Sequence, residues 1–438
     1  MNVYQERRSA LRRRLGEAVL VVPAAQHALR NADTEYEYRQ DSDFFYLTGF
    51  SEPEAVLVIA PQRAGEAVTL FLRPRKRDQE IWTGRRLGVE AAAATLGLDA
   101  AYPIDEFDRR LADFLVGAPT LYYAFGRDEA FDRRVHAALT EARYRVRRGG
   151  TAPSTFIEPA TLVHELRLHK SAAEIETMRR AAQITRIGHV AAMSATRPGL
   201  YEYELEAIIE FQYRLHGAQD VAYPSIVASG ENACILHYNS NRDELRDGTL
   251  LLVDSGCEVD SYASDVTRTW PVNGRFTPEQ RAIYEIVLRA QETAIGHVRP
   301  GEPFDAYHNV AKRVLTEGLI DLGLLSGSID GCIESKAIDA FYPHRAGHWI
   351  GLDVHDAGRY KNLDDTYRTL EAGMVLTVEP GLYIQPDSDA DERFRGIGVR
   401  IEDDVLCTTG GPDILSAGIP KTIADVEALV GADALTSA

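Results

Sequence analysis

Two acidic residues in the second half of the sequence each end an apolar run. Asp254 follows "LLLV" six residues after Gly248, and Glu379 follows "VLTV" six residues after Gly373. Both runs predict buried strands. Such strands would carry an ionised carboxylate into or beside the core, where burial is costly unless the charge is paired or bound to a cation. For a single acid, a surface position at a strand end is the simpler interpretation.

Each of these acids is followed by a second β-like run that holds another acid. Asp265 lies in "YASDVTRTW" and Glu402 lies in "GIGVRIEDDVLCT". The two halves of this region therefore present corresponding pairs of carboxylates. Four acids in two matched halves favour a pseudo-symmetric site in which oxygen ligands converge on metal.

The stretch "YPHRAGHWIGLDVHD" adds three histidines, His344, His348 and His355. On spacing alone, a metal site formed by all three stays an alternative. Four carboxylates and one imidazole would suit two divalent ions about 3.5–4 Å apart, as in two-metal hydrolytic sites. Mostly oxygen ligands favour Mn²⁺, with Co²⁺, Fe²⁺ or Zn²⁺ as alternatives.

A weak internal repeat indicates which elements position these groups. Residues 187–217 and 295–318 each contain Ile-Gly-His-Val, which we expect to end a helix, then Arg-Pro-Gly and the start of another helix. Upstream, Ser171 and Glu174 form a capping-box pattern that predicts a helix start. A stretch rich in Gly, Pro, Ser and Thr precedes it, so we place a domain boundary near residue 165.

The residues before this boundary predict an α/β domain of their own. Strand-like runs such as "EAVLVIAP" and "AVTLFLRP" alternate with amphipathic stretches such as "FDRRLADFLVG". The N-terminal "MNVYQERRSALRRRLGEAVLVVPAA" has its short apolar segment interrupted by Gly16 and Glu17, so it predicts a surface helix and a strand rather than a signal peptide.

Composition narrows the class of function. The net charge of −18, from 48 basic and 66 acidic residues spread along the chain, argues against nucleic acid or an anionic membrane as partner. No apolar run approaches the roughly 20 residues that span a bilayer. The four cysteines, Cys234, Cys257, Cys332 and Cys407, form no CxxC pair and no disulfide framework. We therefore expect a cytoplasmic, globular protein of two domains.

Five motifs in order resemble those of the pita-bread metallopeptidases, and most closely those of the Xaa-Pro aminopeptidases (aminopeptidase P). They are "LLLVDSG", "YASDVTRTW", "HRAGHWIGLDVHD", "VLTVEPGLY" and "GIGVRIEDD". The N-terminal "YRQDSDFFYLTGFSEPEAVLVIAP" and "EIWTGRRLG" resemble the amino-terminal domain of that group. The resemblance implies an α/β two-domain chain. Residues 1–165 would form the N-terminal mixed α/β domain, and residues 166–438 the catalytic pseudo-two-fold α+β domain of the creatinase and methionine aminopeptidase type.

The resemblance also assigns metal ligands. Asp265 and Glu402 would bridge two divalent ions, most simply Mn²⁺, while Asp254 would bind one ion and His348 and Glu379 the other. The implied reaction is hydrolysis of the bond between an N-terminal residue and a following proline, by a hydroxide that bridges the ions. The implied substrates are peptides with proline in second position, and the implied assembly is a homo-oligomer, either a dimer or a tetramer.

Further residues match the family at positions near the substrate. Glu379 would also transfer the proton, and His355 and His237, the latter in "CILHYNS", would donate to the tetrahedral intermediate. The matches assigned to substrate binding or support of the site are His344, Tyr383, Arg400, Asp43 and Trp82.

Some of these residues have simpler interpretations. Arg400 stands two residues before Glu402, so in one strand both would share a face and Arg400 would pair with a metal-site carboxylate. Asp43 and Trp82 resemble residues that reach the site across subunits, but Asp43 would equally cap a turn and Trp82 would equally be a core or interface aromatic. Arg345 stands where close relatives would have Gly, so it either alters the substrate rim or points to solvent.

Two other functions share the expected metal site. A prolidase would accept Xaa-Pro dipeptides alone, and its N-terminal domain would block the pocket beyond proline. A pita-bread protein without activity would serve as a binding module, although all five ligand positions are filled here. Methionine aminopeptidases share the ligand set but generally lack the long N-terminal domain.

Overall fold

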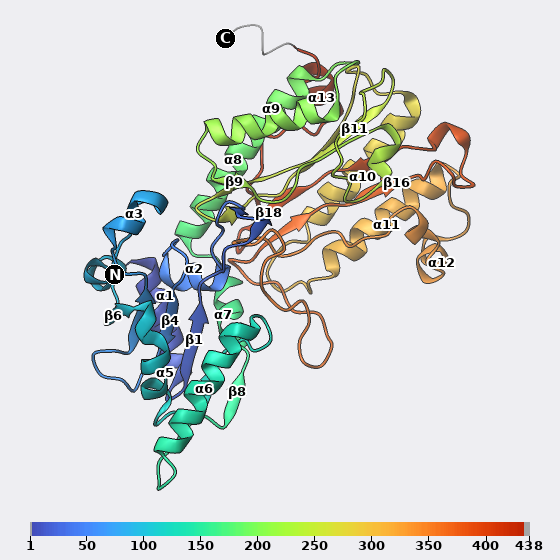
Figure 1. Ribbon diagram of the computed structural model, residues 1–438. Coiled ribbons are helices and arrows are strands. Elements are labelled where there is room, and N and C mark those ends of the chain that lie inside the picture. Colours follow the sequence, from blue (N-terminus) through green and yellow to red (C-terminus); the bar gives the residue numbers. More distant parts are fainter. Residues whose placement is uncertain (1, 433–438) are drawn as a thin grey trace. The chain divides into compact units, whose positions relative to one another are not determined.

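The computed structural model describes residues 2–432 of a chain that folds as two compact units, residues 1–167 and 168–438 (Figure 1). The predicted boundary near residue 165 falls inside α7 (Ala160–Arg167), the helix that ends the first unit. The division therefore follows the end of this helix and not the Gly- and Pro-rich stretch before it.

The first unit is built on a six-stranded mixed sheet with the order β6-β5-β4-β1-β7-β8. Strand β1 pairs antiparallel with β4 and parallel with β7, and the apolar runs predicted as strands supply β1, β4, β5 and β7. The strands are β1 (Val19–Pro23), β4 (Val56–Ile59), β5 (Val68–Leu72), β6 (Ala100–Pro103), β7 (Thr120–Tyr122) and β8 (Thr155–Ile157), beside a separate hairpin of β2 (Leu29–Asn31) and β3 (Thr34–Glu35).

Aromatic side chains join this sheet to its helices. Phe71 of β5 meets Phe107 edge-on with 5.3 Å between ring centroids, and Phe107 lies 5.4 Å from Phe131. All three are buried, so the amphipathic stretches predicted as helices pack on the sheet as expected. The helices are α1 (Val3–Leu15), α2 (Ser42–Thr48), α3 (Arg77–Thr83), α4 (Val89–Leu96), α5 (Phe107–Leu115), α6 (Glu129–Arg145) and α7.

The second unit contains two corresponding three-stranded antiparallel sheets, β10-β11-β14 and β15-β18-β19. The two apolar runs that carry acids are β11 and β15, and both are fully buried. The strands are β9 (Asp220–Val221), β10 (Ile226–Ser229), β11 (Leu250–Asp254), β12 (Cys257–Val259), β13 (Tyr262–Ala263), β14 (Thr267–Pro271), β15 (Val375–Val378), β16 (Gly381–Tyr383), β17 (Gly398–Arg400), β18 (Asp403–Thr408) and β19 (Gly411–Ile414).

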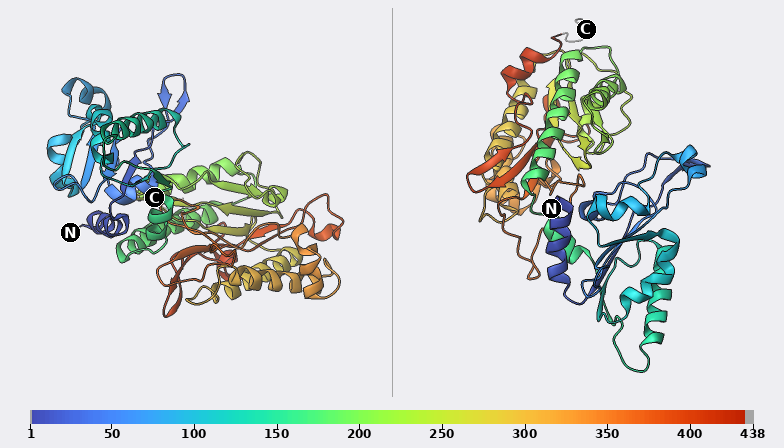
Figure 2. Two further views of the ribbon diagram at one scale, coloured as in Figure 1. Left: turned by 90° about the horizontal axis from the view of Figure 1, so that it is seen from below. Right: turned by 90° about the vertical axis from the view of Figure 1, so that its left-hand side faces the viewer.

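Two helix pairs accompany these sheets, α8 (Ala172–Ala195) with α9 (Glu202–Leu215) and α10 (Pro278–Ile295) with α11 (Ala306–Asp321). Figure 2 shows the first pair in green and the second in orange, each beside the strands of its own half. Helices α12 (Ile329–Glu334) and α13 (Ile423–Leu429) complete the unit. No helix among residues 2–432 has the length and hydropathy needed to cross a membrane.

A glycine allows close approach in each pair. A Cβ on Gly188 of α8 would lie 2.6 Å from the Tyr213 ring of α9, and one on Gly318 of α11 would lie 2.6 Å from Ile286 of α10. The internal repeat is thus confirmed as two like layers. One detail of the prediction is wrong, because the first Ile-Gly-His-Val, residues 187–190, lies inside α8 and does not end it. Helix α8 continues through these residues, and its Gly188 lies in the close contact with α9. The helix does begin after the Ser171 capping box as predicted.

Candidate metal centre and active site

The strand β11 ends at Asp254, the first of the predicted ligands. Its five residues are buried, and Asp254 lies opposite Ile226 on β10 and Thr267 on β14. The apolar residues before Asp254 anchor the strand in the core, which leaves the carboxylate at its end with 9% exposure. This is the buried position at a strand end that the sequence predicts.

Glu379 and His348 are positioned together by strand β15. The backbone N–H of Thr377 donates to the His348 carbonyl at 2.9 Å, and the N–H of Glu379 donates to the Ala346 carbonyl at 2.8 Å. An isolated bridge pairs Trp349 with Leu376 in the same segment. Because residues 346–349 run along β15, the imidazole of His348 and the carboxylate of Glu379 face one site.

The other two acids lie where the two halves meet. The N–H of Glu402 donates to the Thr267 carbonyl at 3.1 Å, and the N–H of Asp265 donates to an oxygen of Asp404 at 3.2 Å. Thr267 also donates from its hydroxyl to the Glu402 carboxylate at 2.6 Å. These bonds cross between the halves in both directions, so each half fixes the backbone segment of the other that carries a site carboxylate.

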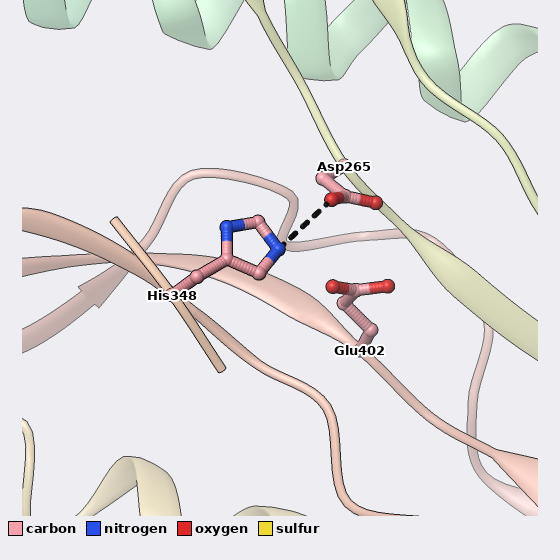
Figure 3. A group of neighbouring side chains, drawn as sticks. All are labelled: Asp265, His348 and Glu402. Atoms are coloured by element: carbon pink, nitrogen blue, oxygen red, sulfur yellow. Dashed lines mark ion pairs between the residues drawn. The ribbon is translucent and has the colours of Figure 1, made fainter. Parts of the chain in front are cut away.

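Three of the predicted ligands form a compact group (Figure 3). One ligand atom from each of Asp265, His348 and Glu402 lies within 4.8 Å of the others. The hydroxyl of Tyr223 lies 2.6 Å from Asp254 and 2.5 Å from Asp265, which brings these two carboxylates to one point. Asp254, Asp265, His348, Glu379 and Glu402 all line one cavity.

The charges of this group are not balanced by the protein alone. Burial, followed by the charges of Asp265 and Glu379, holds the pKa of Glu402 well above its usual range. Burial raises the pKa of Glu379 to about 7, although His348 and Arg400 oppose the shift. Such a surplus of buried carboxylates fits bound divalent cations, which would neutralise it.

His348 presents the correct nitrogen for a metal. Its Nδ1 lies 2.9 Å from the Trp349 carbonyl and donates to it, so Nε2 faces the carboxylates and becomes a possible metal ligand when it loses its proton. Nε2 lies 3.4 Å from Asp265 and 3.8 Å from Glu379. Burial would lower the pKa of His348, but the hydrogen bond and charge of Asp265 raise it to about 9. A backbone carbonyl behind the ring is the usual support of a histidine ligand.

The cavity beside these residues measures about 800 Å³. It contains all three histidines that the sequence assigns to the substrate side, His237, His344 and His355. Its apolar walls include Ile226, Leu236 and Phe304. A cavity of this size accommodates a short peptide and not a folded protein.

A chain of hydrogen bonds connects Asp254 with His344. Arg400 donates to Asp254 at 2.6 Å and to the Tyr383 hydroxyl oxygen at 3.0 Å. The Tyr383 hydroxyl lies 2.8 Å from Nε2 of His344, whose Nδ1 lies 2.7 Å from the Arg345 carbonyl. Burial, then the charge of Arg400, lowers the pKa of His344 to about 3. His344 is therefore neutral, with Nδ1–H donating and Nε2 accepting.

The other two histidines are more exposed. The His355 ring meets the His348 ring edge-on with 4.4 Å between centroids, and burial, then the charge of His348, lowers its pKa. His237 lies in an exposed turn after the 3₁₀-helix η2 (Gly230–Cys234). Both line the same cavity as the five predicted metal ligands.

Asp43 and Trp82 both belong to the first unit. The Asp43 carboxylate is buried and accepts from Arg167 at 2.7 Å and from His164 at 3.1 Å. Trp82 lies on α3 and is 87% exposed. Asp43 thus holds α2 to α7, whereas Trp82 has the exposure that contact with another molecule requires. Their assignments to substrate stay predictions.

Tyr223 and Thr267 are the site residues that sequence reasoning missed. Tyr223 precedes β10, whose Ile226 lies opposite Asp254, and Thr267 lies opposite Asp254 on β14. An aromatic residue and a hydroxyl residue flanking strands next to a buried acid are the available signal. The prediction that Arg400 pairs with a metal-site carboxylate is confirmed, because Arg400 donates to Asp254. The shared strand with Glu402 is wrong, because β17 ends at Arg400.

Comparison with known proteins agrees with this fold and site. The model of metallopeptidase family M24 matches residues 176–409, and the model of the aminopeptidase P N-terminal domain matches residues 4–122. The chain therefore belongs to metallopeptidase family M24, the class that its two matched halves and its carboxylate–histidine group define.

Within that family the chain is similar to Xaa-Pro aminopeptidases. It is 47% identical to the Xaa-Pro aminopeptidase of Escherichia coli K12 over 98% of this chain and 97% of the relative. The aminopeptidase PepP structure of Pseudomonas aeruginosa matches with a TM-score of 0.95 at 48% identity, over 98% of this chain and 97% of that one. A zinc-substituted E. coli aminopeptidase P in complex with product matches with a TM-score of 0.94 at 46% identity, over 98% and 97% of the two chains.

Proposed function

We propose that the protein is a metal-dependent aminopeptidase that removes an N-terminal residue when proline follows it. The observation that carries this proposal is the meeting of four carboxylates and one imidazole, from two matched halves, at the wall of a peptide-sized cavity. The E. coli relative, which matches over nearly the whole of both chains, is named an Xaa-Pro aminopeptidase, and this name supports the choice of the Xaa-Pro bond.

Two divalent ions would be held by Asp254, Asp265, His348, Glu379 and Glu402, and Mn²⁺ suits this mostly oxygen ligand set. Such ions supply two effects when bound, a lowered pKa of coordinated water and a polarised carbonyl. The two halves of the unit would supply different ligands to the ions. The first half would supply Asp254 and Asp265, which meet at Tyr223, and the second would supply Glu379, Glu402 and the imidazole of His348.

The side chains of the cavity perform the remaining steps. A carboxylate oxygen of Glu379 takes a proton from the attacking water and passes it to the leaving nitrogen. In an Xaa-Pro bond that nitrogen is tertiary and carries no N–H, so recognition relies on an apolar pocket for the ring. Ile226, Leu236 and Phe304 offer such walls. His355 and His237 donate to the oxygen of the tetrahedral intermediate.

The rest of the proposal concerns the cellular compartment and the oligomeric state of the enzyme. The four cysteines are free and buried, which suits a reducing cytoplasm. The 87% exposure of Trp82 suits contact with a second copy in a dimer or tetramer. In such an oligomer Trp82, and Asp43 with it, would contribute to substrate binding.

The test compares Gly-Pro with a longer Xaa-Pro-Xaa peptide, using protein loaded with Mn²⁺. We expect the longer peptide to release its first residue, and we expect a chelator to stop the reaction until Mn²⁺ is restored. Cleavage of the dipeptide alone would replace the proposal with a prolidase. No cleavage of either peptide would favour a binding module.

A further inference from the structure

Arg345 places a positive charge on the wall of the active-site cavity. Its guanidinium carbon lies 5.1 Å from the centre of the Tyr367 ring, and both residues line the cavity. A ring at this distance attracts the cation. The side chain is exposed and, among residues 2–432, no carboxylate lies within ion-pair distance of it.

The other cations of the cavity are already paired. Arg400 donates to Asp254 at 2.6 Å, and Lys361 lies 2.8 Å from Asp365. Lys361 also lies 5.2 Å from the Tyr367 ring, on which Arg345 rests. Arg345 is therefore the cavity cation whose donors are available to a ligand.

Other aromatic residues line the same cavity as Tyr367, the ring on which Arg345 rests. Tyr360 lies 4.8 Å from Phe304 between ring centroids and stacks on Trp349 at 5.7 Å, and both Tyr360 and Phe304 line the cavity. The backbone of Arg345 is held separately, because its carbonyl accepts from His344 at 2.7 Å and the next N–H donates to His308 at 3.2 Å. The Arg345 side chain can therefore be replaced without removing these bonds.

The charged residues of the cavity would determine the orientation in which a peptide binds. The acids Asp254, Asp265, Glu379 and Glu402 gather at one part of the wall, to which a free α-amine is attracted. An anionic group farther along the same peptide is attracted to Arg345. A guanidinium also matches a carboxylate with two parallel donors.

We propose that Arg345 binds a carboxylate on the residue that follows proline, and so sets a preference for anionic substrates. The inference rests on the proposed aminopeptidase function and extends it to substrate selection. Two sources share this chemistry, the terminal carboxylate of a tripeptide and the side chain of Asp or Glu in a longer peptide.

The experiment measures kcat/KM for two matched substrate pairs with the Mn²⁺-loaded enzyme. The first pair is Ala-Pro-Ala with a free or an amidated C-terminus, and the second is Ala-Pro-Glu-amide against Ala-Pro-Gln-amide. We expect the anionic member of at least one pair to be preferred by roughly 3- to 10-fold, the range of a charge-assisted contact in a partly open site. The pair that shows the preference identifies the source. The ratio should fall in high salt.

Substitutions test whether Arg345 causes the preference, measured as the ratio of kcat/KM for the anionic peptide to that for its neutral partner. The R345M ratio should fall to near one and the R345E ratio should invert. R359M is the matched control, since it removes the same charge from the same loop at an exposed residue outside the cavity, and it should keep the wild-type ratio. Y367F keeps the ring and should keep the ratio, whereas Y367A should lower it.

Every outcome of these measurements either supports the proposed role of Arg345 or overturns it. Thermal melting and metal content establish that every variant is folded and loaded before ratios are compared. An equal wild-type rate on both members of both pairs would overturn the role of Arg345, and so would an R345M ratio equal to that of wild type. Failure of the wild-type enzyme on all four peptides would overturn the aminopeptidase function itself, and the inference with it.

Discussion

The guanidinium of Arg400 donates a 2.6 Å hydrogen bond to the carboxylate of Asp254, from the opposite half of the catalytic unit. Both groups are buried, and Arg400 is 4% exposed. Burial raises the pKa of Asp254, and the charge of Arg400 opposes that rise. The arginine thus stabilises the fold and also favours the charged form of Asp254, a predicted metal ligand.

Replacing Arg400 with Leu should reduce both the stability of the protein and its activity. Breaking one side of a buried ion pair costs about 3–5 kcal/mol, because the remaining charge is left without a partner. We expect the free energy of unfolding to fall by that amount in urea titrations, and kcat/KM to fall by about 10- to 100-fold, the scale of a lost supporting contact at a metal site. R400K, which keeps the charge but not the planar donors, should recover part of the stability. A R400L enzyme with wild-type stability would contradict this role.

Glu402→Ala should abolish activity and reduce bound metal. Glu402 is 2% exposed and lies in the compact group with Asp265 and His348. Removing one bridging carboxylate takes a ligand from both proposed ions. Metal analysis by mass spectrometry after dialysis gives the measurement. Retention of both metal and turnover at wild-type levels would overturn the two-metal site.

His348 and His355 should separate metal binding from turnover. Their rings lie 4.4 Å apart, but only His348 has its Nδ1 fixed by a backbone carbonyl so that Nε2 faces the acids. H348A should therefore lose metal, whereas H355A should keep metal and lose turnover by about 100- to 1000-fold, the cost of a missing oxyanion donor. Equal metal loss in both variants would mean that both histidines are ligands.

Titration of His189 should lower the free energy of unfolding in mild acid. Burial, and then the charge of Arg268, lowers its pKa to about 4, while its Nε2 lies 3.0 Å from the Ser255 carbonyl. Since the folded pKa is below the unfolded value of 6.5, the unfolded state binds the proton first. The contribution is complete above pH 6.5 and is lost as the pH falls toward about 4, a difference of roughly 3 kcal/mol.

The pH test compares unfolding free energies of wild type and H189Q between pH 7 and pH 4. Glutamine retains a donor for the Ser255 carbonyl but does not titrate in this range. The wild-type curve should be steeper, and its excess slope should be confined to the interval between the two pKa values. Parallel curves would show that protonation of His189 has no part in acid stability.

Much of the site could be predicted because its acids end buried strands. The alternation of apolar runs and carboxylates located Asp254 and Glu379, and the matched second runs located their partners. Spacing left three histidines as candidates. The choice of His348 depends on the alignment of its segment with β15, which brings Trp349 opposite Leu376.

The missed contacts depend on strand pairing between distant segments. Tyr223 reaches Asp254 because β10 lies antiparallel to β11, and no local pattern records that pairing. The same holds for Arg400, whose partner comes from a residue 146 positions away. The orientation of Trp82 relative to any other chain likewise lies beyond a sequence pattern.

The bonds that connect Thr267 with Glu402 have a consequence for how the protein folds. These residues are 135 positions apart, so their contact closes a long loop whose entropic cost precedes any gain from the site. Each half can form its local sheet and helix pair from shorter-range contacts. Assembly of the catalytic centre should therefore be a late event on the folding pathway, and a newly made chain would gain its shape before it gains its activity.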